Sequence, residues 1–403
     1  MCTNVFKEVA SHYNSKGSNV YACLVDASKA FDRVNYEKLF QLVLKRNLPG
    51  VIIRFLLDAY TRQYAYIKWE GEFSDVIHMH NGVKQGGVLS ATLFCIYMDE
   101  LMSRLEQTGV GCYIGNSFYG GLSYADDLKL MCPSVSGLQK LLKTCEEFGI
   151  EYSVTYNAKK TICICYGVSK CDSIRRLCLY GNHLSWESSV KYLGNIHTST
   201  MCDNKDINYQ RGIYISAVNR LNSQFSMTPV NVKATLLQTY CSAWYGSQTW
   251  PLHSAAVGRF NTEWNKAVRR TLRLPYKTRT RLLPHLVGND NFVTQIEKRW
   301  LRLFHSMLGS KNDKISYIAK KSVQNAIGVL GQNRIFLALK YNVRDICEIK
   351  NLPASCCGRD AADSELISRV QQIKELLSAR EGHCTIDVLD GETDFILEYL
   401  CTY

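Results

Sequence analysis

The stretch that decides the fold is GGLSYADDLKLM at residues 120–131, in which two short apolar runs meet at two adjacent aspartates. Leu128 and Leu130 flank Lys129 in the period-2 pattern of a strand, and the glycine and aspartate pairs are typical turn residues. The stretch therefore predicts a β-hairpin with acidic residues at its tip. Close like charges destabilise one another unless a cation lies between them, so this is a candidate divalent-metal site. A solvated acidic turn is the alternative.

A third carboxylate, Asp26, follows the β-rich apolar run VYACLV at residues 20–25. The carboxyl end of a buried strand is where open α/β sheets place their chemistry. After Asp26 the pattern becomes helical through Asp32. Between this acid and the hairpin lies NGVKQGGVLS at residues 81–90, a glycine-rich turn that leads into an apolar helix at residues 91–105. Such a turn allows backbone N–H groups to approach a phosphate or a base.

Hydrophobic periodicity outlines the remaining elements. We expect a hairpin of residues 64–70 and 73–80, a helix that Ser134 or Ser136 caps and Gly149 closes, and a strand at residues 162–166. Further helices are predicted at residues 4–13, 36–46, 51–60, 203–227, 231–245 and 259–274. This order of strands and helices is typical of an α+β fold.

Three stretches, DASKAFD at 26–32, NGVKQGGVLSATLF at 81–94 and SYADD at 123–127, resemble motifs A, B and C of reverse transcriptases from non-LTR (LINE-type, jockey-like) retrotransposons. YNAKKT at 156–161 is similar to motif D, and VKYLG at 190–194 is similar to the primer-grip motif E. The resemblance covers about half of the chain. It implies an α+β polymerase palm of the right-hand type, followed by an α-helical thumb and a helical C-terminal region.

The expected domains follow from this resemblance. Residues 1–197 would form the palm with partial fingers, residues 198–310 a basic helical thumb or connection, and residues 311–403 a helical region without an assigned role. A chain of 403 residues exceeds what one core usually holds. Only 25 residues precede Asp26, so we expect an N-terminally truncated polymerase whose fingers motifs and endonuclease are missing or supplied by another chain.

The resemblance implies nucleotidyl transfer, in which two divalent ions stabilise the attacking primer 3′-oxygen and the leaving oxygen. Asp26 and Asp126 are the expected bridging ligands, and Asp127 is a third acid closer to the primer-side ion. These hard oxygen donors suit two Mg²⁺ ions, with Mn²⁺ as a substitute. Lys160 is the expected general acid toward pyrophosphate. Lys159 competes for that role, and a solvated lysine pair is the alternative.

Nucleotide and primer contacts are also implied by the resemblance. Phe31 matches the position whose ring lies beneath the incoming sugar and excludes a 2′-hydroxyl, so the expected substrates are dNTPs. The alternative is that Phe31 is a core residue at the start of a helix. Gln85 and Gly86 match the motif B pair that contacts the incoming nucleotide. The residues expected to hold the primer terminus are Tyr192, Leu193 and Gly194.

The formal net charge of +12 favours a polyanionic partner such as nucleic acid. Residues 259–302 contain eleven basic and three acidic residues, interleaved with Trp264, Tyr276 and Trp300. This pattern suits a surface that grips a template–primer duplex through its phosphates, whereas a solvated basic helix face is the alternative. The expected nucleic-acid ligands are Arg269, Arg270, Arg273, Lys277, Arg279 and Arg281.

Other features exclude several classes of protein. The seventeen cysteines are odd in number, irregularly spaced and not preceded by a signal peptide, so we expect reduced, mostly buried thiols in an intracellular protein. If active, it would act in the nucleus and cytoplasm. No run approaches the about 18 apolar residues of a membrane span, so no membrane association is expected. Cys356, Cys357, His383 and Cys384 lack the regular spacing of a zinc site.

Two functions of different class remain. The first is an RNA-directed DNA polymerase with an RNA template, a DNA primer and dNTPs as partners. The second is a catalytically inactive, truncated remnant that only binds nucleic acid. The three intact aspartates favour the first, and the short segment before Asp26 favours the second, because a primer misplaced by about 1 Å can slow catalysis by about 10²-fold.

Overall fold

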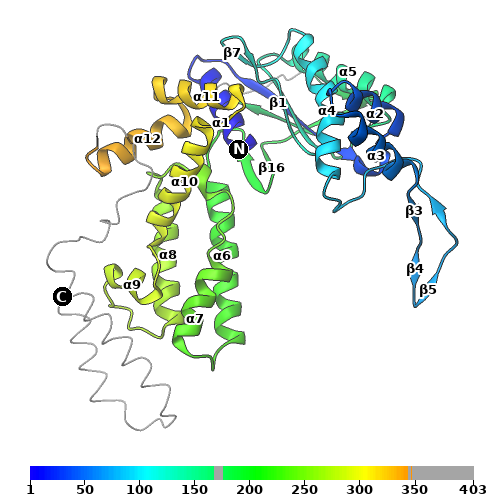
Figure 1. Cartoon of the computed structure of the whole chain (residues 1–403). Helices are drawn as coiled ribbons and strands as arrows, with labels where there is room; N and C mark the ends of the chain where they lie inside the picture. The colour runs from blue at the N-terminus through cyan, green and yellow to red at the C-terminus, as the bar shows by residue number, and fades with distance from the viewer. Residues whose placement is uncertain (168–175, 344–345, 347–403) are drawn as a thin grey trace. The chain divides into compact units, whose positions relative to one another are not determined.

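The computed structural model describes residues 1–167, 176–343 and 346, which divide into two compact units (Figure 1). The N-terminal unit contains residues 2–193 and 198–201. The C-terminal unit contains residues 1 and 194–197 and the described residues from 202 onward. Each unit has its own hydrophobic core, as expected when a chain is too long for a single core.

In the described part of the N-terminal unit, the main sheet has five strands in the order β15, β12, β1, β10, β9. Their bounds are β1 (Val20–Val25), β9 (Gly121–Tyr124), β10 (Asp127–Cys132), β12 (Ile162–Tyr166) and β15 (Ser185–Trp186). β1 pairs antiparallel with both β10 and β12, and β12 pairs in parallel with β15. The apolar sequence of β1 suits this central place, because a central strand is covered on both faces.

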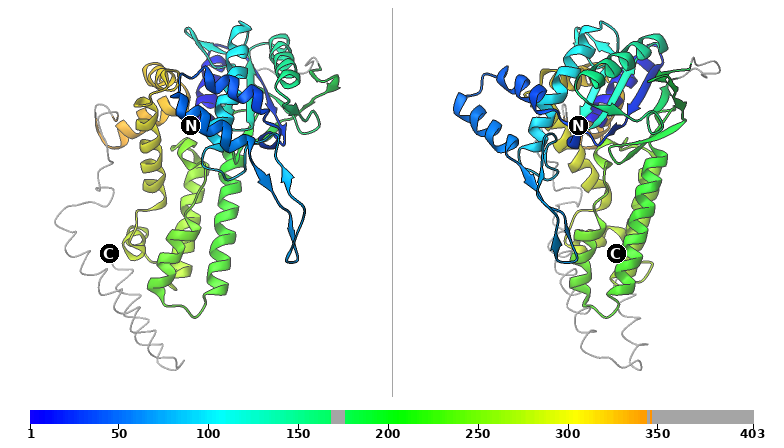
Figure 2. Two further views of the ribbon diagram at one scale, coloured as in Figure 1. Left: turned by 45° about the vertical axis from the view of Figure 1, so that its right-hand side comes forward. Right: turned by 90° about the vertical axis from the view of Figure 1, so that its right-hand side faces the viewer.

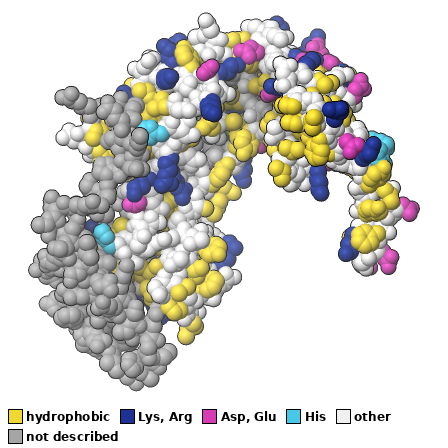
Figure 3. All heavy atoms as spheres, viewed as in Figure 1, with side chains coloured by type: hydrophobic (Ala, Val, Ile, Leu, Met, Phe, Trp, Pro, Cys, Tyr) yellow, Lys and Arg dark blue, Asp and Glu magenta, His cyan; other side chains and the backbone are white. Residues whose placement is uncertain are grey.

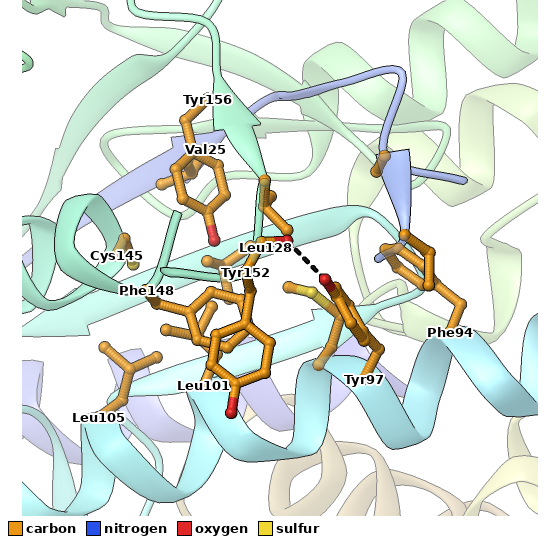
Figure 4. Close-up of a cluster of buried hydrophobic side chains, with 14 of the residues drawn as sticks. Val25, Phe94, Tyr97, Leu101, Leu105, Leu128, Cys145, Phe148, Tyr152 and Tyr156 are labelled. Atoms are coloured by element: carbon orange, nitrogen blue, oxygen red, sulfur yellow. Dashed lines mark hydrogen bonds between the residues drawn. The ribbon is translucent and has the colours of Figure 1, made fainter. Parts of the chain in front are cut away.

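Helices α4 (Ser90–Gln107) and α5 (Val135–Glu151) pack on one face of this sheet. Figure 4 shows Val25 and Leu128 from the strands among side chains of both helices, and Tyr97 of α4 donates a hydrogen bond to the Tyr152 carbonyl. The other face meets α1 (Cys2–Asn14), whose Phe6 ring lies 4.7 Å from the Tyr166 ring. The sheet is therefore buried on both sides, and its chemistry lies at the strand ends.

The remaining elements of the N-terminal unit are short. Residues after Asp26 form β2 (Ala27–Ser28), which pairs with β11 (Thr155–Tyr156), and a 3₁₀ turn, η1 (Phe31–Arg33). The others are α2 (Tyr36–Leu44), α3 (Gly50–Thr61), β3 (Tyr64–Ala65), β4 (Lys68–Trp69), β5 (Glu72–Phe73), β6 (Ile77–His78), β7 (Tyr113–Ile114), β8 (Ser117–Phe118), β13 (Cys178–Leu179), β14 (Asn182–His183) and β16 (Ser189–Tyr192). Ser134, one of the two serines expected to cap α5, accepts from the Gly137 N–H. Asn35 caps α2 by accepting from the Lys38 N–H.

The C-terminal unit is almost entirely helical where it is described. After β17 (Asn195–Thr198), its elements are α6 (Asn204–Gln224), α7 (Val230–Leu236), a π-helical turn η2 (Leu237–Cys241), η3 (Ser247–Thr249), α8 (Ala255–Thr271), η4 (Thr280–Leu282), α9 (Leu283–Val287), α10 (Phe292–Leu308), α11 (Asp313–Asn325) and α12 (Gly328–Lys340). None of the described helices is long and apolar enough to cross a membrane. The predicted break near residues 351–360 and the four tail residues weighed for zinc lie outside the described part.

Most predicted helices and strands are confirmed, with three differences. Gly149 lies inside α5, which continues to Glu151. A Cβ at Gly149 would lie 2.5 Å from both the Val154 carbonyl oxygen and the Tyr180 hydroxyl, so the glycine permits close packing there rather than ending the helix. The helix expected after Asp26 is replaced by β2 and one 3₁₀ turn. The helix predicted at residues 231–245 ends at Cys241, since the chain turns at Trp244 with φ of 29°.

Candidate active site

Asp26 and Asp127 face each other at the same end of two paired strands. Val25 of β1 pairs with Leu128 of β10, and continuing this register by one residue places Asp26 opposite Asp127. Directly opposed residues of antiparallel strands have Cα atoms roughly 4.5–5.5 Å apart and side chains on the same face. The strands that carry the two acidic motifs are therefore neighbours in the sheet.

The turn between β9 and β10 presents the third carboxylate, Asp126. Tyr124 pairs with Asp127, so the connection is a two-residue turn of Ala125 and Asp126. Ala125 has φ of 53°, in the left-handed region that such turns require and that glycine adopts more readily. The sequence predicted both acids at the tip; instead Asp126 is in the turn and Asp127 begins the strand, because the ladder extends one residue further.

The three carboxylates interact electrostatically. The pKa of Asp127 is raised above its ordinary value, first because the surrounding protein partly desolvates its charged form and then because Asp126 and Asp26 are negative. Asp126 and Asp127 are exposed, and Asp26 is half-buried. Repulsion of this kind is relieved when a cation binds between the carboxylates.

The donor set fits a hard cation in its chemistry, since carboxylate oxygens are the ligands that Mg²⁺ prefers. Within the described residues, however, no three His, Cys, Asp or Glu side chains converge on one point as metal ligands. The charges of Asp26, Asp126 and Asp127 thus suit the predicted ions, while the side chains are not gathered into a three-ligand cluster. The metal site stays a prediction.

The motif D turn is hydrogen-bonded to Asp26. The Asn157 N–H donates to the Asp26 carbonyl over 2.8 Å, and the Asp26 N–H donates to Thr161 Oγ1 over 3.3 Å. Asn157 Oδ1 accepts from the backbone N–H groups of Lys159 and Lys160, which forms the turn. Both lysine side chains are exposed. The backbone of predicted general acid Lys160 is thereby held beside the strand end that carries Asp26.

The glycine-rich loop is anchored to the segment that follows Asp26. The Gly82 N–H donates to the Val34 carbonyl over 2.8 Å, and the Val83 N–H donates to the Phe31 carbonyl over 2.7 Å. Gly82 has φ of +90°, and a Cβ there would lie 2.8 Å from the Asp32 carbonyl oxygen. This close approach requires glycine.

The predicted nucleotide residues lie on this loop and at its anchor. Gln85 and Gly86 are the exposed central residues of a turn that the Gly87 N–H closes on the Lys84 carbonyl over 3.0 Å. Phe31 is half-buried and stacks on the buried Phe94 ring, with centroids 4.6 Å apart. Phe31 is therefore held rigidly at the edge of the core, and its contact with a sugar stays a prediction.

Residue Lys129 is a feature of the site that the sequence reasoning missed. The alternating pattern marked it as the polar side of β10, yet it is 0% exposed. Its ammonium lies 3.2 Å from the Phe6 ring centroid and 4.5 Å from that of Tyr192, and it donates to the Tyr166 hydroxyl over 3.4 Å. Burial lowers the pKa of Lys129 well below its ordinary value. The sequence does contain one indication of this burial. The first helix has an apolar face, and that face must pack against one side of the sheet.

The three residues predicted to hold the primer terminus lie where the chain leaves β16. Tyr192 is buried against Lys129, so its ring does not face solvent. Leu193 and Gly194 both have positive φ, 44° and 78°. Any primer contact at this point would therefore come from the backbone of the turn rather than from the tyrosine ring.

The basic residues of the C-terminal unit have mixed roles. Arg269 is half-buried, and its guanidinium donates twice to the Thr278 carbonyl, over 3.0 and 2.7 Å. Arg273 donates to the Ser226 carbonyl and Arg270 to Asn219 Oδ1. These bonds hold the helix ends together. Lys277 and Arg281 are exposed, and Arg279 is half-buried.

The aromatic residues expected on this basic surface are mostly in the core, which corrects the prediction. Trp264 and Trp300 are buried, and Tyr276 is exposed. Both tryptophans lie on the apolar faces of amphipathic helices, α8 and α10. Basic and aromatic residues alternate along the sequence because they lie on opposite faces of the same helices, and they do not form one surface.

Comparison with known proteins gives the family. Residues 2–197 match the model of the family "Reverse transcriptase (RNA-dependent DNA polymerase)". Over 202 residues the chain is 27% identical to a Pol polyprotein of the type-2 retrotransposable element R2DM of Drosophila melanogaster, covering 48% of this chain and 19% of that protein. Over 199 residues it is 30% identical to a Pol polyprotein of the type-1 element R2 of Popillia japonica, covering 46% and 32%.

A further relative is the RNA-directed DNA polymerase of the mobile element jockey of Drosophila funebris, 25% identical over 210 residues, which are 50% of this chain and 22% of the relative. The chain thus spans a third or less of the length of these three relatives. Among solved structures, a telomerase from Candida tropicalis in complex with a fragment of telomeric RNA matches with 12% identity and a TM-score of 0.42, covering 78% of this chain and 51% of that chain. Residues 2–197 therefore form a reverse transcriptase (RNA-dependent DNA polymerase) domain related to those of the non-LTR retrotransposons R2 and jockey.

Proposed function

We propose that this chain is an RNA-directed DNA polymerase that adds dNTPs to a primer 3′-hydroxyl on an RNA template. The observation that carries the proposal is the opposition of Asp26 and Asp127 across β1 and β10, with Asp126 in the adjoining turn. Carboxylates on neighbouring strand ends are what two-ion nucleotidyl transfer needs. In this proposal the N-terminal unit is the palm with partial fingers, and the C-terminal unit contains the thumb.

Asp26, Asp126 and Asp127 would hold Mg²⁺ or Mn²⁺. When bound, two such ions supply charge stabilisation at the attacking and leaving oxygens of the phosphoryl transfer. The protein's own contribution is to keep the carboxylates together against their repulsion, which the pairing of β1 with β10 achieves through the backbone. The raised pKa of Asp127 is consistent with an anionic cluster that gains from a cation.

The loop and turn beside Asp26 would bind and orient the nucleotide. Phe31 would lie beneath the sugar and exclude a 2′-hydroxyl. Its stacking on Phe94 would prevent the Phe31 ring from moving aside to admit that hydroxyl. Gln85 and the backbone of Gly86 are exposed on the glycine-rich turn and would contact the incoming nucleotide. Lys160 would donate a proton to the leaving pyrophosphate oxygen.

The C-terminal unit would hold the duplex of RNA template and DNA primer. The basic side chains at the end of α8 and in the segment after it carry this role in the proposal, since cations bind phosphates whatever the base sequence. Lys277 is a good candidate among them because it is exposed, and its ammonium lies 5.8 Å from the ring of its neighbour Tyr276.

A second candidate function is nucleic-acid binding without catalysis. It is favoured by one observation, that no three potential metal ligands converge within the described part of the chain. The two candidates differ in whether added divalent ions and dNTPs lead to extension.

Primer extension on an RNA template distinguishes them. Purified protein would be given a DNA primer, dNTPs and Mg²⁺ or Mn²⁺, beside the double variant Asp126→Ala/Asp127→Ala. Extension by the wild type that the variant loses would establish the polymerase. If neither the wild type nor the variant extends the primer, and both retain salt-sensitive RNA binding, the polymerase function is rejected and the binding function remains.

A further inference from the structure

A β-ribbon of strands β3 to β6 extends from the helices of the N-terminal unit (Figures 1 and 2). This ribbon exposes large hydrophobic side chains. In the described part of the chain, β3 pairs with β6 and β4 pairs with β5, and such two-stranded pairs form no core of their own. The exposed fractions of its large apolar side chains lie between 37% and 74%. These side chains are Tyr64, Tyr66, Ile67, Trp69, Phe73, Val76, Ile77 and Met79. Figure 3 shows hydrophobic side chains along the side of the ribbon that faces the viewer, interrupted by polar and charged ones.

One face of the ribbon is formed by rings and a cation. Tyr64 pairs with His78, and their rings are 5.0 Å apart. Lys68 pairs with Phe73, whose ring lies 5.2 Å from the Lys68 ammonium and 6.5 Å from the Tyr66 ring. Paired residues and residues two apart share a face. We call these five residues, Tyr64, Tyr66, Lys68, Phe73 and His78, the aromatic face.

The opposite face differs in charge. Trp69 pairs with Glu72, and Ala65 pairs with Ile77. The Glu72 carboxylate therefore lies on the same face as Trp69, opposite the aromatic face. The register of the β3–β6 pair differs by one residue from that of the β4–β5 pair. The extra residue forms a β-bulge between the two pairs, and Asp75 lies in it. Lys68 forms no ion pair within the described residues, and its charge rests against the Phe73 ring.

We infer that the aromatic face is a stacking surface for single-stranded nucleic acid. Such surfaces combine π-faces for the bases with cations for the phosphates, and they need no groups that read the base sequence. Residues two apart in a strand are about 6.8 Å apart, so Tyr64 and Tyr66 can each present a ring to a different base. The Tyr66 and Phe73 rings meet edge-on at 87°, so a base would stack on a ring face rather than between these two rings. A protein strand would also find apolar contact here, but it would leave the unpaired Lys68 charge without an anion.

This inference rests on the proposed function, because a polymerase that copies RNA must hold a single-stranded template ahead of the duplex. It adds a binding element for the uncopied strand. Stacking on one ring contributes about 5- to 100-fold in affinity, so loss of two rings is a large and measurable effect.

Fluorescence anisotropy with a labelled single-stranded RNA and an RNA duplex of equal length tests the inference on the full chain. The variant Tyr66→Ala/Phe73→Ala removes two rings from the aromatic face. The matched control, Ile67→Ala/Trp69→Ala, removes similar exposed apolar area from the same ribbon. We expect the first to weaken single-strand binding by at least about 20-fold and to leave duplex binding unchanged, while the control has little effect. Equal effects of the two variants, or none, would overturn the inference.

Lys68→Gln supplies a second readout. Each phosphate contact on a single strand contributes about 0.7 to the slope of log affinity against log salt, so this variant should flatten that slope by about 0.7. An unchanged slope would contradict a phosphate contact. If Tyr66→Ala/Phe73→Ala instead changes self-association of the chain and leaves RNA binding intact, the surface binds protein and the inference is wrong.

Failure of the inference and of the proposed function are distinguishable, because binding is measured without dNTPs. If extension fails but the Tyr66 and Phe73 rings are needed for single-strand binding, the stacking surface stands and the polymerase assignment fails. If extension succeeds and the ring variant binds single strands normally, the inference alone fails.

Discussion

Asp26 lies opposite Asp127 where β1 ends and β10 begins, and the negative charge of Asp26 contributes to raising the pKa of Asp127. Because Asp26 and Asp126 both raise the pKa of Asp127, removing either charge should lower that pKa. We predict that Asp26→Asn moves the pKa of Asp127 toward its ordinary value of about 3.9 without reaching it, since partial desolvation is the larger cause. A ¹³C NMR titration of the carboxyl groups measures this shift. Asp75→Asn, on the ribbon, is the control, and an unchanged pKa in Asp26→Asn would contradict the opposition of the two acids.

The raised pKa of Asp127 also has a consequence for stability. A folded-state pKa above the unfolded one means that the folded state binds the proton more tightly, so ionisation of Asp127 destabilises the fold as pH rises through that interval. Asp127→Asn should therefore raise the free energy of unfolding at pH 7, and the gain should vanish below about pH 3.9. Urea unfolding at several pH values measures it. A variant that is less stable than the wild type at pH 7 would contradict the prediction.

Lys129 gives a pH dependence at the alkaline end. Its pKa in the folded state is far below its ordinary value, so between the two values the unfolded chain binds more protons and stability rises with pH. We expect Lys129→Met, which keeps the packing against Phe6 and Tyr192, to stabilise the N-terminal unit at pH 7 by about 1–3 kcal/mol. The gain should shrink toward pH 10. Comparing urea unfolding of the two proteins isolates Lys129 from other titrating groups.

The exposed Lys159→Met is the control for this experiment, and it should change stability little at either pH. If Lys129→Met is instead less stable at both pH values, then the contacts of the ammonium with the surrounding rings outweigh the cost of its burial.

Substitution of Gly82 should destabilise the fold far more than substitution of a glycine of similar backbone conformation. Gly82→Ala and Gly71→Ala both place a side chain at positive φ, +90° and +97°, but only at Gly82 does the new Cβ meet backbone, 2.8 Å from the Asp32 carbonyl. We expect Gly82→Ala to cost about 1–3 kcal/mol more than Gly71→Ala in thermal or urea unfolding. If the proposed function holds, Gly82→Ala should also raise the KM for dNTPs. Equal costs would mean that the loop is not anchored as described.

The buried carboxylate of Asp206 organises the C-terminal unit. It accepts hydrogen bonds from Trp250 Nε1 over 2.8 Å, Asn195 Nδ2 over 3.2 Å and the Ile196 N–H over 2.9 Å. Asp206→Asn cannot accept all three, and we predict a loss of about 1.5–3 kcal/mol in unfolding followed by tryptophan fluorescence. Glu263→Gln, which only breaks a surface pair with Lys266, should cost less than about 1 kcal/mol. Similar costs for both would contradict a structural role for Asp206.

Local pattern predicted the elements that carry the acids. The apolar run before Asp26 and the alternation after Asp127 are features of single strands, and both strands form as expected. Their pairing could not be read from periodicity, since register depends on contacts between distant residues; the motif resemblance supplied it. The position of Asp127 within the strand rather than the turn was missed for the same reason, because one residue of register decides it.

The residues that were misjudged are those whose surroundings come from distant parts of the chain. Lys129 was taken for the polar side of a strand, yet the rings of Phe6 and Tyr192, far away in sequence, bury it. Trp264 was placed on a basic surface because arginines surround it in sequence, although on a helix its neighbours in space are the residues three and four positions away. The exposure of the aromatic rings on the ribbon likewise could not be predicted from the sequence. An alternating pattern predicts a strand but does not show whether another element covers it.

The central claim is that β1 and β10 together create an ion site at Asp26, Asp126 and Asp127. Mn²⁺ titration followed by electron paramagnetic resonance tests it most directly on the purified chain, with Asp26→Asn and the ribbon variant Asp75→Asn beside the wild type. The account predicts that Asp26→Asn weakens Mn²⁺ binding by at least about 10-fold and that Asp75→Asn does not. Equal binding by all three proteins would contradict it.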